Sequence, residues 1–355
     1  MNYSDKIRAK IVDAQSSIIQ AMKMMDEGKT KSLLVFTSDR FLGIVTNGDL
    51  QRAIIAKKPF ETAIEKILNN KNKKYAHVND DRESIKEWMR QKRAEFMPIL
   101  DSEGHLVDVI FWDDIFSELP VVDNRPQIHL PVVIMAGGKG TRLKPLTNVI
   151  PKPLIPVGEK TILEEIMDQF EKIGCNKFFM SVNYKSDMMR FYLEQLEHNY
   201  DIIFFEEERP LGTVGSVSLL KGKINTPFFV SNCDILIDQD YRDVYEYHIG
   251  NQNDLTIVTA IKSFRIPYGV IETGENGLMI GLREKPELTY MINTGVYIVN
   301  SECIDEIPQG KFFHITQLME KIKMRGGRVG CFPVSEHAWR DMGEWSEYLR
   351  MIKVL

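Results

Sequence analysis

The feature that most constrains this chain is a short apolar run that leads straight into a glycine-rich turn. The run is Val132–Met135 (VVIM), and residues 136–143 read AGGKGTRL. A continuous apolar stretch of this length is typical of a buried parallel strand. Three glycines in four positions let the backbone approach a ligand closely, and their N–H groups can hold phosphate oxygens. The pattern predicts a phosphate-binding turn, with a tight connection that binds no ligand as the alternative.

Two positively charged side chains follow the glycines. Arg142 ends the turn, and Lys152 lies in residues 151–157, which read PKPLIPV. The prolines on either side of Lys152 restrict the backbone, so its ammonium group is presented at low entropic cost. The turn is not a Walker P-loop, because no Lys-Ser or Lys-Thr pair follows the glycines, and it lacks the full G-x-G-x-x-G spacing. Another kind of phosphate site is therefore expected.

Length and composition indicate that these motifs belong to the second of two domains. With 355 residues, 43% of them hydrophobic, the chain is long enough for two separate cores. Residues 119–130 (LPVVDNRPQIHL) contain two prolines and no sustained period, and we expect a linker over residues 121–130. The predicted domains are therefore residues 1–120 and residues 131–355.

Charge and cysteine usage exclude several classes of protein. The formal net charge of −5 gives no global basic field, so nucleic acid is not an expected partner. The chain has no run near the roughly 18 apolar residues of a membrane span, and its start lacks the apolar core of a signal peptide. Its four cysteines show neither a C-x-x-C pair nor zinc-binding spacing. We expect a cytoplasmic protein with buried thiols and no membrane contact.

The first domain shows one structural pattern twice. Ser17 precedes a helical apolar period, two strands follow within residues 32–45, and another helix is expected from Asp49. The same order of helix, two strands and helix returns within residues 80–114, with the last helix expected from Asp113. The sequence therefore predicts two tandem units of similar structure.

Residues 43–50 (GIVTNGDL), in this setting, resemble the second half of a CBS motif, and the resemblance covers roughly residues 5–120. In that family two motifs pack as one module, and residues like Thr46 and Asp49 bind the phosphate and ribose of an adenine nucleotide. A hydroxyl and a carboxylate at a helix start suit this role. The second copy has Phe111 where Thr46 would align, so one such site at most is expected. The alternative is that Thr46 ends a strand and Asp49 caps the next helix.

In the second domain, residues 136–147 (AGGKGTRLKPLT) and 151–158 (PKPLIPVG) together resemble the signature of the sugar-phosphate nucleotidyltransferase family. Further matches extend the resemblance over about residues 130–350. It implies an α/β fold, with a Rossmann-like, GT-A type mixed sheet, preceded by the α+β tandem CBS module. It also implies transfer of a nucleotidyl group from a nucleoside triphosphate to a sugar 1-phosphate, with Mg²⁺ as cofactor and pyrophosphate as product.

The same resemblance implies roles for individual residues. Asp234 and Asp341 are expected to bind the magnesium ion, while Arg142, Lys152 and Lys285 hold the phosphate groups. The nucleotide is expected to contact Gly137, Gly138, Gly140, Thr141 and Gly212, and the sugar to contact Gly269, Glu284 and Asn293. Each residue also has an ordinary alternative role, such as a helix cap, a turn or a solvated charge pair.

The combination of domains favours particular substrates but leaves alternatives open. A CBS pair before such a domain resembles bacterial guanylyltransferases that act on glucosamine 1-phosphate for surface sugars, so GTP and glucosamine 1-phosphate are expected. Mannose 1-phosphate, and UTP, CTP or dTTP, remain open. A protein that senses nucleotides without turnover is a rival, which the presence of Arg142, Asp234 and Asp341 disfavours. The paired CBS helices also lead us to expect a homo-oligomer.

Overall fold

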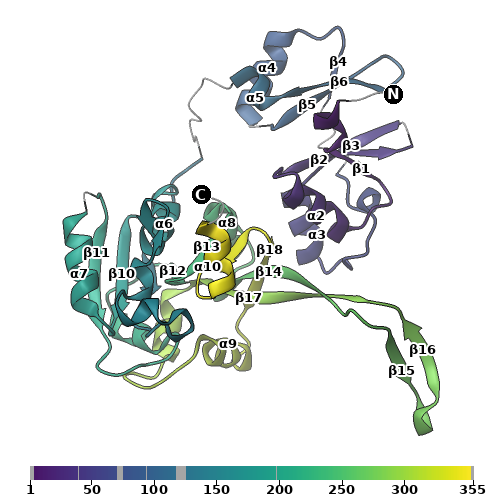
Figure 1. Cartoon of the computed structure of the whole chain (residues 1–355). Coiled ribbons are helices and arrows are strands. Elements are labelled where there is room, and N and C mark those ends of the chain that lie inside the picture. Colours follow the sequence, from purple (N-terminus) through teal and green to yellow (C-terminus); the bar gives the residue numbers. More distant parts are fainter. Residues whose placement is uncertain are drawn as a thin grey trace. The chain divides into compact units, whose positions relative to one another are not determined.

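A computed structural model of the chain describes residues 4–38, 40–69, 75–92, 94–116, 125–196 and 198–352. The chain divides into two compact units, Met1–Asn124 and Arg125–Leu355 (Figure 1). The division lies inside the stretch 119–130 that the sequence predicts as a linker, of which residues 119–124 are outside the described part. Each unit is described by itself below.

The first unit contains two three-stranded sheets with the same pairing pattern. In each sheet the first strand runs parallel to the second, and the second runs antiparallel to the third. The strands are β1 (Ile11–Asp13), β2 (Ser32–Thr37), β3 (Arg40–Thr46), β4 (Ala76–His77), β5 (Phe96–Leu100) and β6 (Leu106–Phe111). The helices are α1 (Asp5–Arg8), α2 (Ile18–Glu27), α3 (Asn47–Ile55), α4 (Arg82–Lys92) and α5 (Trp112–Phe116). The repeated pairing agrees with the two tandem units predicted from the sequence.

The two halves of this unit share a core. Phe36 and Phe41 of the first half and Phe96 and Phe111 of the second half belong to one buried apolar cluster. Glu95 adds a polar connection, because its carboxylate accepts hydrogen bonds from the Thr30 hydroxyl at 2.8 Å and from the Lys31 amide. Burial of a shared apolar face means that neither half is a complete domain.

Local capping explains where the helices of this unit begin. Ser17 caps α2 as predicted, in a reciprocal capping box with Gln20. The helix predicted from Asp49 begins earlier, at Asn47, because Thr46 serves as its N-cap. The last helix likewise begins at Trp112 and not at Asp113. These corrections of one or two residues reflect capping geometry that apolar periodicity does not reveal.

The second unit is built on a seven-stranded mixed sheet in the order β11-β10-β7-β12-β17-β14-β18. Strands β11, β10, β7 and β12 are parallel, β17 runs antiparallel to both of its neighbours, and β18 is parallel to β14. The strands are β7 (Val132–Met135), β10 (Lys177–Val182), β11 (Asp201–Glu206), β12 (Phe228–Asn232), β14 (Leu255–Arg265), β17 (Glu287–Val299) and β18 (Val329–Ser335). The predicted buried strand at residues 132–135 is thus confirmed and lies inside the sheet.

Helices cover both faces of this sheet. Val132 and Ile134 belong to one buried cluster and Val133 to another, so alternate residues of β7 enter separate cores. The helices are α6 (Ile162–Glu171), α7 (Ser186–Gln195), α8 (Tyr241–Gly250), α9 (Ile315–Met324) and α10 (Trp345–Ile352). This layered arrangement is the expected Rossmann-like α/β architecture.

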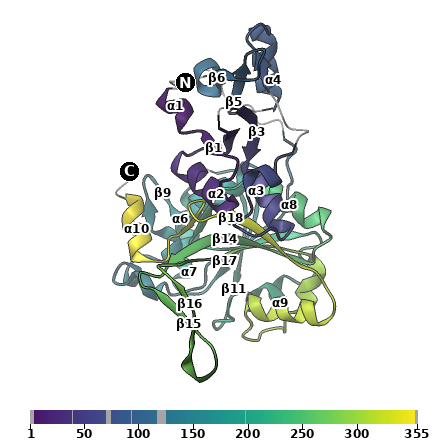
Figure 2. The ribbon, with the colours of Figure 1, turned by 90° about the vertical axis from the view of Figure 1, so that its right-hand side faces the viewer.

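Three small two-stranded sheets complete the second unit. Strand β13 (Ile235–Ile237) pairs with β19 (Trp339–Asp341), and β8 (Pro156–Val157) pairs with β9 (Lys160–Thr161). Strands β15 (Val270–Thr273) and β16 (Met279–Arg283) form a hairpin that projects from the far ends of β14 and β17, as Figures 1 and 2 show. The first of these pairs lies at the candidate site.

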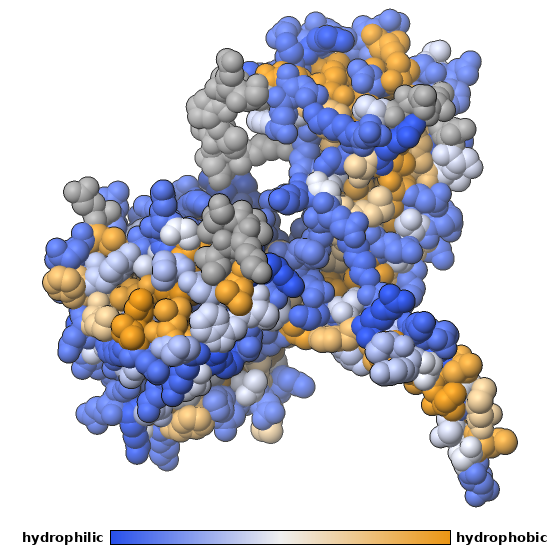
Figure 3. All heavy atoms as spheres, in the orientation of Figure 1, coloured by the Kyte–Doolittle hydropathy of each residue, from blue (hydrophilic) through white to orange (hydrophobic). Residues whose placement is uncertain are grey.

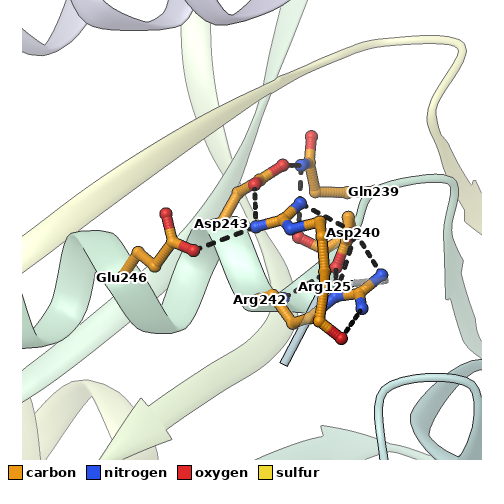
Figure 4. A network of polar contacts seen from close by, with 6 residues as sticks. All are labelled: Arg125, Gln239, Asp240, Arg242, Asp243 and Glu246. Atoms are coloured by element: carbon orange, nitrogen blue, oxygen red, sulfur yellow. Dashed lines mark hydrogen bonds and ion pairs between the residues drawn. The ribbon is translucent and has the colours of Figure 1, made fainter. Parts of the chain in front are cut away.

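The beginning of the second unit is fixed to the start of α8 by a network of charged groups (Figure 4). The Arg125 guanidinium contacts Asp240 at 2.9 Å, Asp243 at 2.7 Å and Glu246 at 3.0 Å. Arg242 also binds the Asp240 carboxylate, at 2.8 Å. Burial raises the pKa of Asp243, as do the negative charges of Asp240 and Glu246, whereas Arg125 lowers it. Arg125 is therefore the cation that keeps three neighbouring acids together.

The described chain offers no helix of the length and apolarity that a bilayer crossing requires. The cysteines Cys175, Cys233 and Cys303 are buried and Cys331 is half-buried, and all four are free thiols. Burial, with a contribution from Asp234, raises the pKa of Cys233 to about 12. A thiol held neutral in this way is a poor nucleophile.

Replacing Arg125 should destabilise the protein. We expect Arg125→Ala to lower the free energy of unfolding by about 2 kcal/mol, because hydrogen bonds between charged groups are lost and three acids are left facing one another. Arg350→Ala is the control, since Arg350 is exposed and its ion pair in the described residues is with Glu347, three positions away. Urea denaturation of both variants measures the difference, and equal midpoints would contradict the role given to Arg125.

Candidate active site

The glycine-rich turn leaves the sheet at the end of β7, at the edge where parallel strands deliver their carboxyl ends. Met135 of β7 lies beside Asn232 of β12 in parallel register, so the chain after each strand emerges at the same edge. Ligands of open α/β sheets bind at this edge. The topology therefore explains why the turn and the segment after β12 meet.

Gly140 adopts a left-handed conformation, with φ of 61°, and packs against the segment that carries Lys152. A Cβ atom at this position would lie 2.8 Å from Thr147 and 3.0 Å from the Cβ of Lys152. Glycine is required here because a side chain would be both strained and obstructed. Gly138, in contrast, has open space around it, so its backbone is accessible to a ligand.

Lys152 is buried and donates a hydrogen bond to the carboxylate of Asp234, which is also buried. Pro151 precedes a 3₁₀ turn, Lys152–Leu154, that orients the lysine side chain inward. A buried ammonium and carboxylate are tolerated because each compensates the charge of the other. The sequence predicted both residues as parts of the site but did not predict that they pair.

Asp234 and Asp341 are brought together by the β13–β19 pair. Ile235, next to Asp234 in the chain, lies opposite Asp341 in this antiparallel ladder, and the Met342 amide donates to the Asp234 carbonyl at 2.8 Å. Burial raises the pKa of Asp341, and the charge of Asp234 raises it further. Two acids held this close indicate a cation site.

Arg142 completes the group of charges. Its guanidinium lies 2.5 Å from Glu344, 3.7 Å from Asp341 and 3.9 Å from Asp234. Burial disfavours the charge of Arg142, but the hydrogen bond to Glu344 and the charges of Asp341 and Asp234 together raise its pKa. Arg142 is half exposed, so its guanidinium can reach a ligand from the open side of the site.

Gly343 marks the centre of this group. A Cβ atom at Gly343 would lie 2.5 Å from the Lys152 ammonium, 2.6 Å from an Asp234 oxygen and 2.8 Å from an Asp341 oxygen. The absence of a side chain is what allows the three charged groups to converge. The sequence resemblance pointed to Asp341 but assigned no role to Gly343 or Glu344.

The donor set suits a magnesium ion. Mg²⁺ prefers oxygen ligands and is usually held by one or two carboxylates, with substrate phosphates and water completing its coordination. Asp234 and Asp341 supply two such carboxylates, and the described residues contain no set of three or more His, Cys, Asp or Glu side chains arranged as a full protein cage. The five charged groups Arg142, Lys152, Asp234, Asp341 and Glu344 sum to one negative charge, which also favours a cation.

Another buried acid, Glu207, lies next to the glycine turn. Glu207 accepts hydrogen bonds from the Ser181 hydroxyl at 2.5 Å and from the Leu211 amide at 2.9 Å. One of its oxygens lies 3.3 Å from the position of a Cβ atom on Gly137. No motif in the sequence singled out Glu207, because its role depends on neighbouring strands that only the fold brings together.

Two other predicted site residues, Gly212 and Asn293, take part in backbone packing and in hydrogen bonds within the fold. Gly212 has φ of 85°, and its missing Cβ would lie 2.6 Å from the carbonyl oxygen of Phe313, so glycine is needed for backbone packing. Asn293 accepts hydrogen bonds from the Gly295 amide and the Tyr297 hydroxyl. Their roles in binding nucleotide and sugar stay predictions, as do those of Gly137, Gly138 and Thr141.

Gly269, Glu284 and Lys285 are not brought to the charged group. They are exposed on the projecting hairpin, where the Lys285 ammonium lies 4.0 Å from the Glu284 carboxylate. Glu287, two residues after Lys285, begins β17 and pairs with Arg265, three residues out from the Tyr290–Lys262 pair at the root of the hairpin. At about 3.3 Å per residue these three residues span roughly 10 Å, and Lys285 lies beyond them. The predicted contacts of these residues with substrate remain untested.

In the first unit, Thr46 and Asp49 bind each other. The Thr46 hydroxyl donates to Asp49 at 2.7 Å, the Asp49 amide donates back to Thr46, and Arg52 contacts the second carboxylate oxygen at 2.5 Å. This reciprocal cap corresponds to the ordinary alternative for the two residues. Their binding to an adenine nucleotide remains a prediction.

A glycine-rich turn, two cations and two converging acids lie together at the carboxyl edge of a mixed sheet. This arrangement is typical of a nucleotide-binding α/β domain. The family model described as "Nucleotidyl transferase" matches residues 131–355, and the chain therefore belongs to this family. A second model, "CBS domain", matches residues 7–56. The match covers the first half of the first unit, and the second half departs from the motif, as Phe111 indicates.

Named relatives resemble the second unit. The chain is 33% identical over 227 residues to a mannose-1-phosphate guanylyltransferase catalytic subunit beta of Dictyostelium discoideum, covering 62% of this chain and 63% of that protein. It is 36% identical over 226 residues to a mannose-1-phosphate guanyltransferase of Pichia angusta, covering 61% and 62%. The chain thus spans about six-tenths of the length of these relatives. The crystal structure of HddC from Yersinia pseudotuberculosis matches with a TM-score of 0.51 and 27% identity, over 64% of this chain and 100% of that one.

Filling the space at Gly343 should impair the site without unfolding the protein. We expect Gly343→Ala to lower kcat/KM on the order of 100-fold, because a displacement of about 1 Å in reacting groups has this effect. Gly250→Ala, at a position with open space in α8, is the control and should keep its activity. Thermal unfolding of both variants checks the fold, and normal activity in Gly343→Ala would reject the proposed convergence of charges.

Proposed function

We propose that this chain transfers a nucleotidyl group from a nucleoside triphosphate to a sugar 1-phosphate and releases pyrophosphate. The observation that carries the proposal is the convergence of Asp234, Asp341, Lys152 and Arg142 beside a glycine-rich turn. Both substrates are strongly anionic, so an enzyme that joins them must hold like charges together. A site with two cations, free backbone amides and a carboxylate pair for a metal meets this requirement.

In the proposed reaction, a phosphate oxygen of the sugar 1-phosphate attacks the α-phosphorus of the triphosphate in line. A new P–O bond forms as the bond to the β-phosphate breaks, and the electron pair leaves with pyrophosphate. The attacking oxygen is already ionised, so a general base is not required. Because the attack and the departure of pyrophosphate occur in one displacement, no covalent enzyme intermediate is needed.

The residues of the site would position the substrates and stabilise charge. Arg142, open to solvent, would bind the triphosphate and stabilise the leaving pyrophosphate, while the turn at residues 137–140 would donate its amides. Lys152 would exchange part of its contact with Asp234 for a substrate phosphate. A magnesium ion held by Asp234 and Asp341 would neutralise phosphate charge when bound.

For the substrates, we propose GTP and glucosamine 1-phosphate, giving GDP-glucosamine. The relatives named as guanylyltransferases support GTP. The choice of glucosamine 1-phosphate depends on the presence of the CBS module. This combination of domains resembles the glucosamine-1-phosphate guanylyltransferase of bacterial legionaminic acid biosynthesis. Mannose 1-phosphate is the second candidate, since the named relatives act on it. Nucleotide substrates and free cysteines fit a cytoplasmic enzyme.

A substrate matrix tests the proposal directly. Each of five nucleoside triphosphates is mixed with glucosamine, mannose or glucose 1-phosphate in the presence of magnesium, and pyrophosphate release is measured. GTP with glucosamine 1-phosphate should give the highest kcat/KM. Arg142→Ala and Asp234→Asn should each lower turnover by about 100-fold or more, whereas Lys221→Ala, which alters an exposed ion pair, should not. Pyrophosphate from no pairing would favour a nucleotide sensor without turnover.

The first unit is proposed to bind an adenine nucleotide through Thr46 and Asp49. We expect AMP at saturating concentration to raise the Tm of the full chain by a few degrees, because a ligand that binds only the folded state stabilises it. Asp49→Asn should abolish this shift, and Asp114→Asn, the corresponding change in the second half, should retain it. An unchanged Tm in the wild-type chain would reject this role.

A further inference from the structure

The projecting hairpin extends beyond the neighbouring strands of the second unit's main sheet. Strand β14 pairs with β18 only up to Ile261, and β12 pairs with β17 only from Val296 onward. From Lys262 to Tyr290, therefore, β14, β15, β16 and β17 form a ribbon of two strands, and no third strand among the described residues pairs with it. Residues 262–290 are called the arm below, and Figures 1 and 2 show it extending from the sheet.

The arm is unusually apolar for an exposed segment. Nineteen large apolar side chains are exposed in the described part of the chain, and eight of them belong to the arm, namely Phe264, Tyr268, Ile271, Leu278, Met279, Ile280, Leu282 and Tyr290. Figure 3 shows hydrophobic residues gathered along its outer part. An exposed apolar patch of this extent marks an interaction surface.

On the outer arm, apolar side chains gather on one face and an ion pair lies on the other. Ile271 lies directly opposite Leu282 in the ladder, so both side chains project from the same face, and they are 53% and 54% exposed. Glu272, on the other face, forms an ion pair with Arg283 at 2.8 Å. An isolated ribbon of two strands is only marginally stable in water. The apolar face therefore needs a partner.

Charge and area together indicate a second copy of this chain as that partner. The arm contains four basic and four acidic residues, so two arms do not repel, although the whole chain carries a net charge of −5. Over its two faces, the eight exposed side chains of the arm leave on the order of 800 Å² open, which is about the area that each partner buries in a standard interface. A surface that meets its own copy across a twofold axis needs this self-complementarity.

We propose that two copies of this chain associate through their arms, with the face that carries Ile271 and Leu282 packed against the same face of the second copy. The contact lies in the second unit, whereas the sequence led us to expect a dimer through the CBS helices. The two possibilities are separable, because the arm can be altered without touching the first unit.

The oligomeric mass of the full chain tests this proposal. Light scattering after gel filtration should give twice the 41.0 kDa of one chain for the wild type and 41.0 kDa for the double variant Ile271→Asp/Leu282→Asp. Met324→Asp is the matched control, since Met324 is 85% exposed on α9, and it should keep the double mass. A wild type of single mass, or a double variant of double mass, would overturn the proposal.

Cross-linking gives a second test that does not depend on how the aspartate variant folds. Leu282→Cys should yield a covalent pair of chains with a bismaleimide reagent, whereas Met324→Cys should yield at least fivefold less. Equal yields from the two variants would also overturn the proposal. Neither measurement uses catalytic activity, so both stand apart from the test of the proposed reaction.

Discussion

The pairing of β13 with β19 is the contact on which the site depends. It joins two segments that are far apart in the chain and places Asp234 next to Asp341, although each acid lies in a short and otherwise ordinary strand or turn. Two carboxylates would repel each other at this distance, and the cost is offset by Lys152, which is buried against Asp234, and by Arg142 on the open side. The β13–β19 ladder fixes the positions of the two acids, and the two cations compensate their negative charge in the absence of a ligand.

Much of this arrangement follows from local sequence. The apolar residues 132–135 predict a buried strand, and the glycines after it predict a turn that leaves backbone amides free, because both features depend only on neighbouring residues. Ser17 was likewise recognisable as a helix cap. Resemblance to known motifs identified Arg142, Lys152, Asp234 and Asp341, which the structure brings together.

Other features depend on tertiary contacts and left no local signal. Lys152 reads as a free phosphate ligand, but folding buries it against Asp234. Glu207 and Glu344 gain their positions only when distant strands meet. Glu284 and Lys285 lie away from Asp234 and Asp341 because the long β14–β17 ladder carries them outward, and nothing in their own sequence indicates where the third strand of the sheet stops.

The anchoring of Arg125 has a mechanical consequence for a chain made of two units. The polypeptide enters the second unit at a point held by three carboxylates at the start of α8, several residues before β7 begins. A displacement of Arg125 would therefore act first on α8, and not on the strand that ends in the glycine turn.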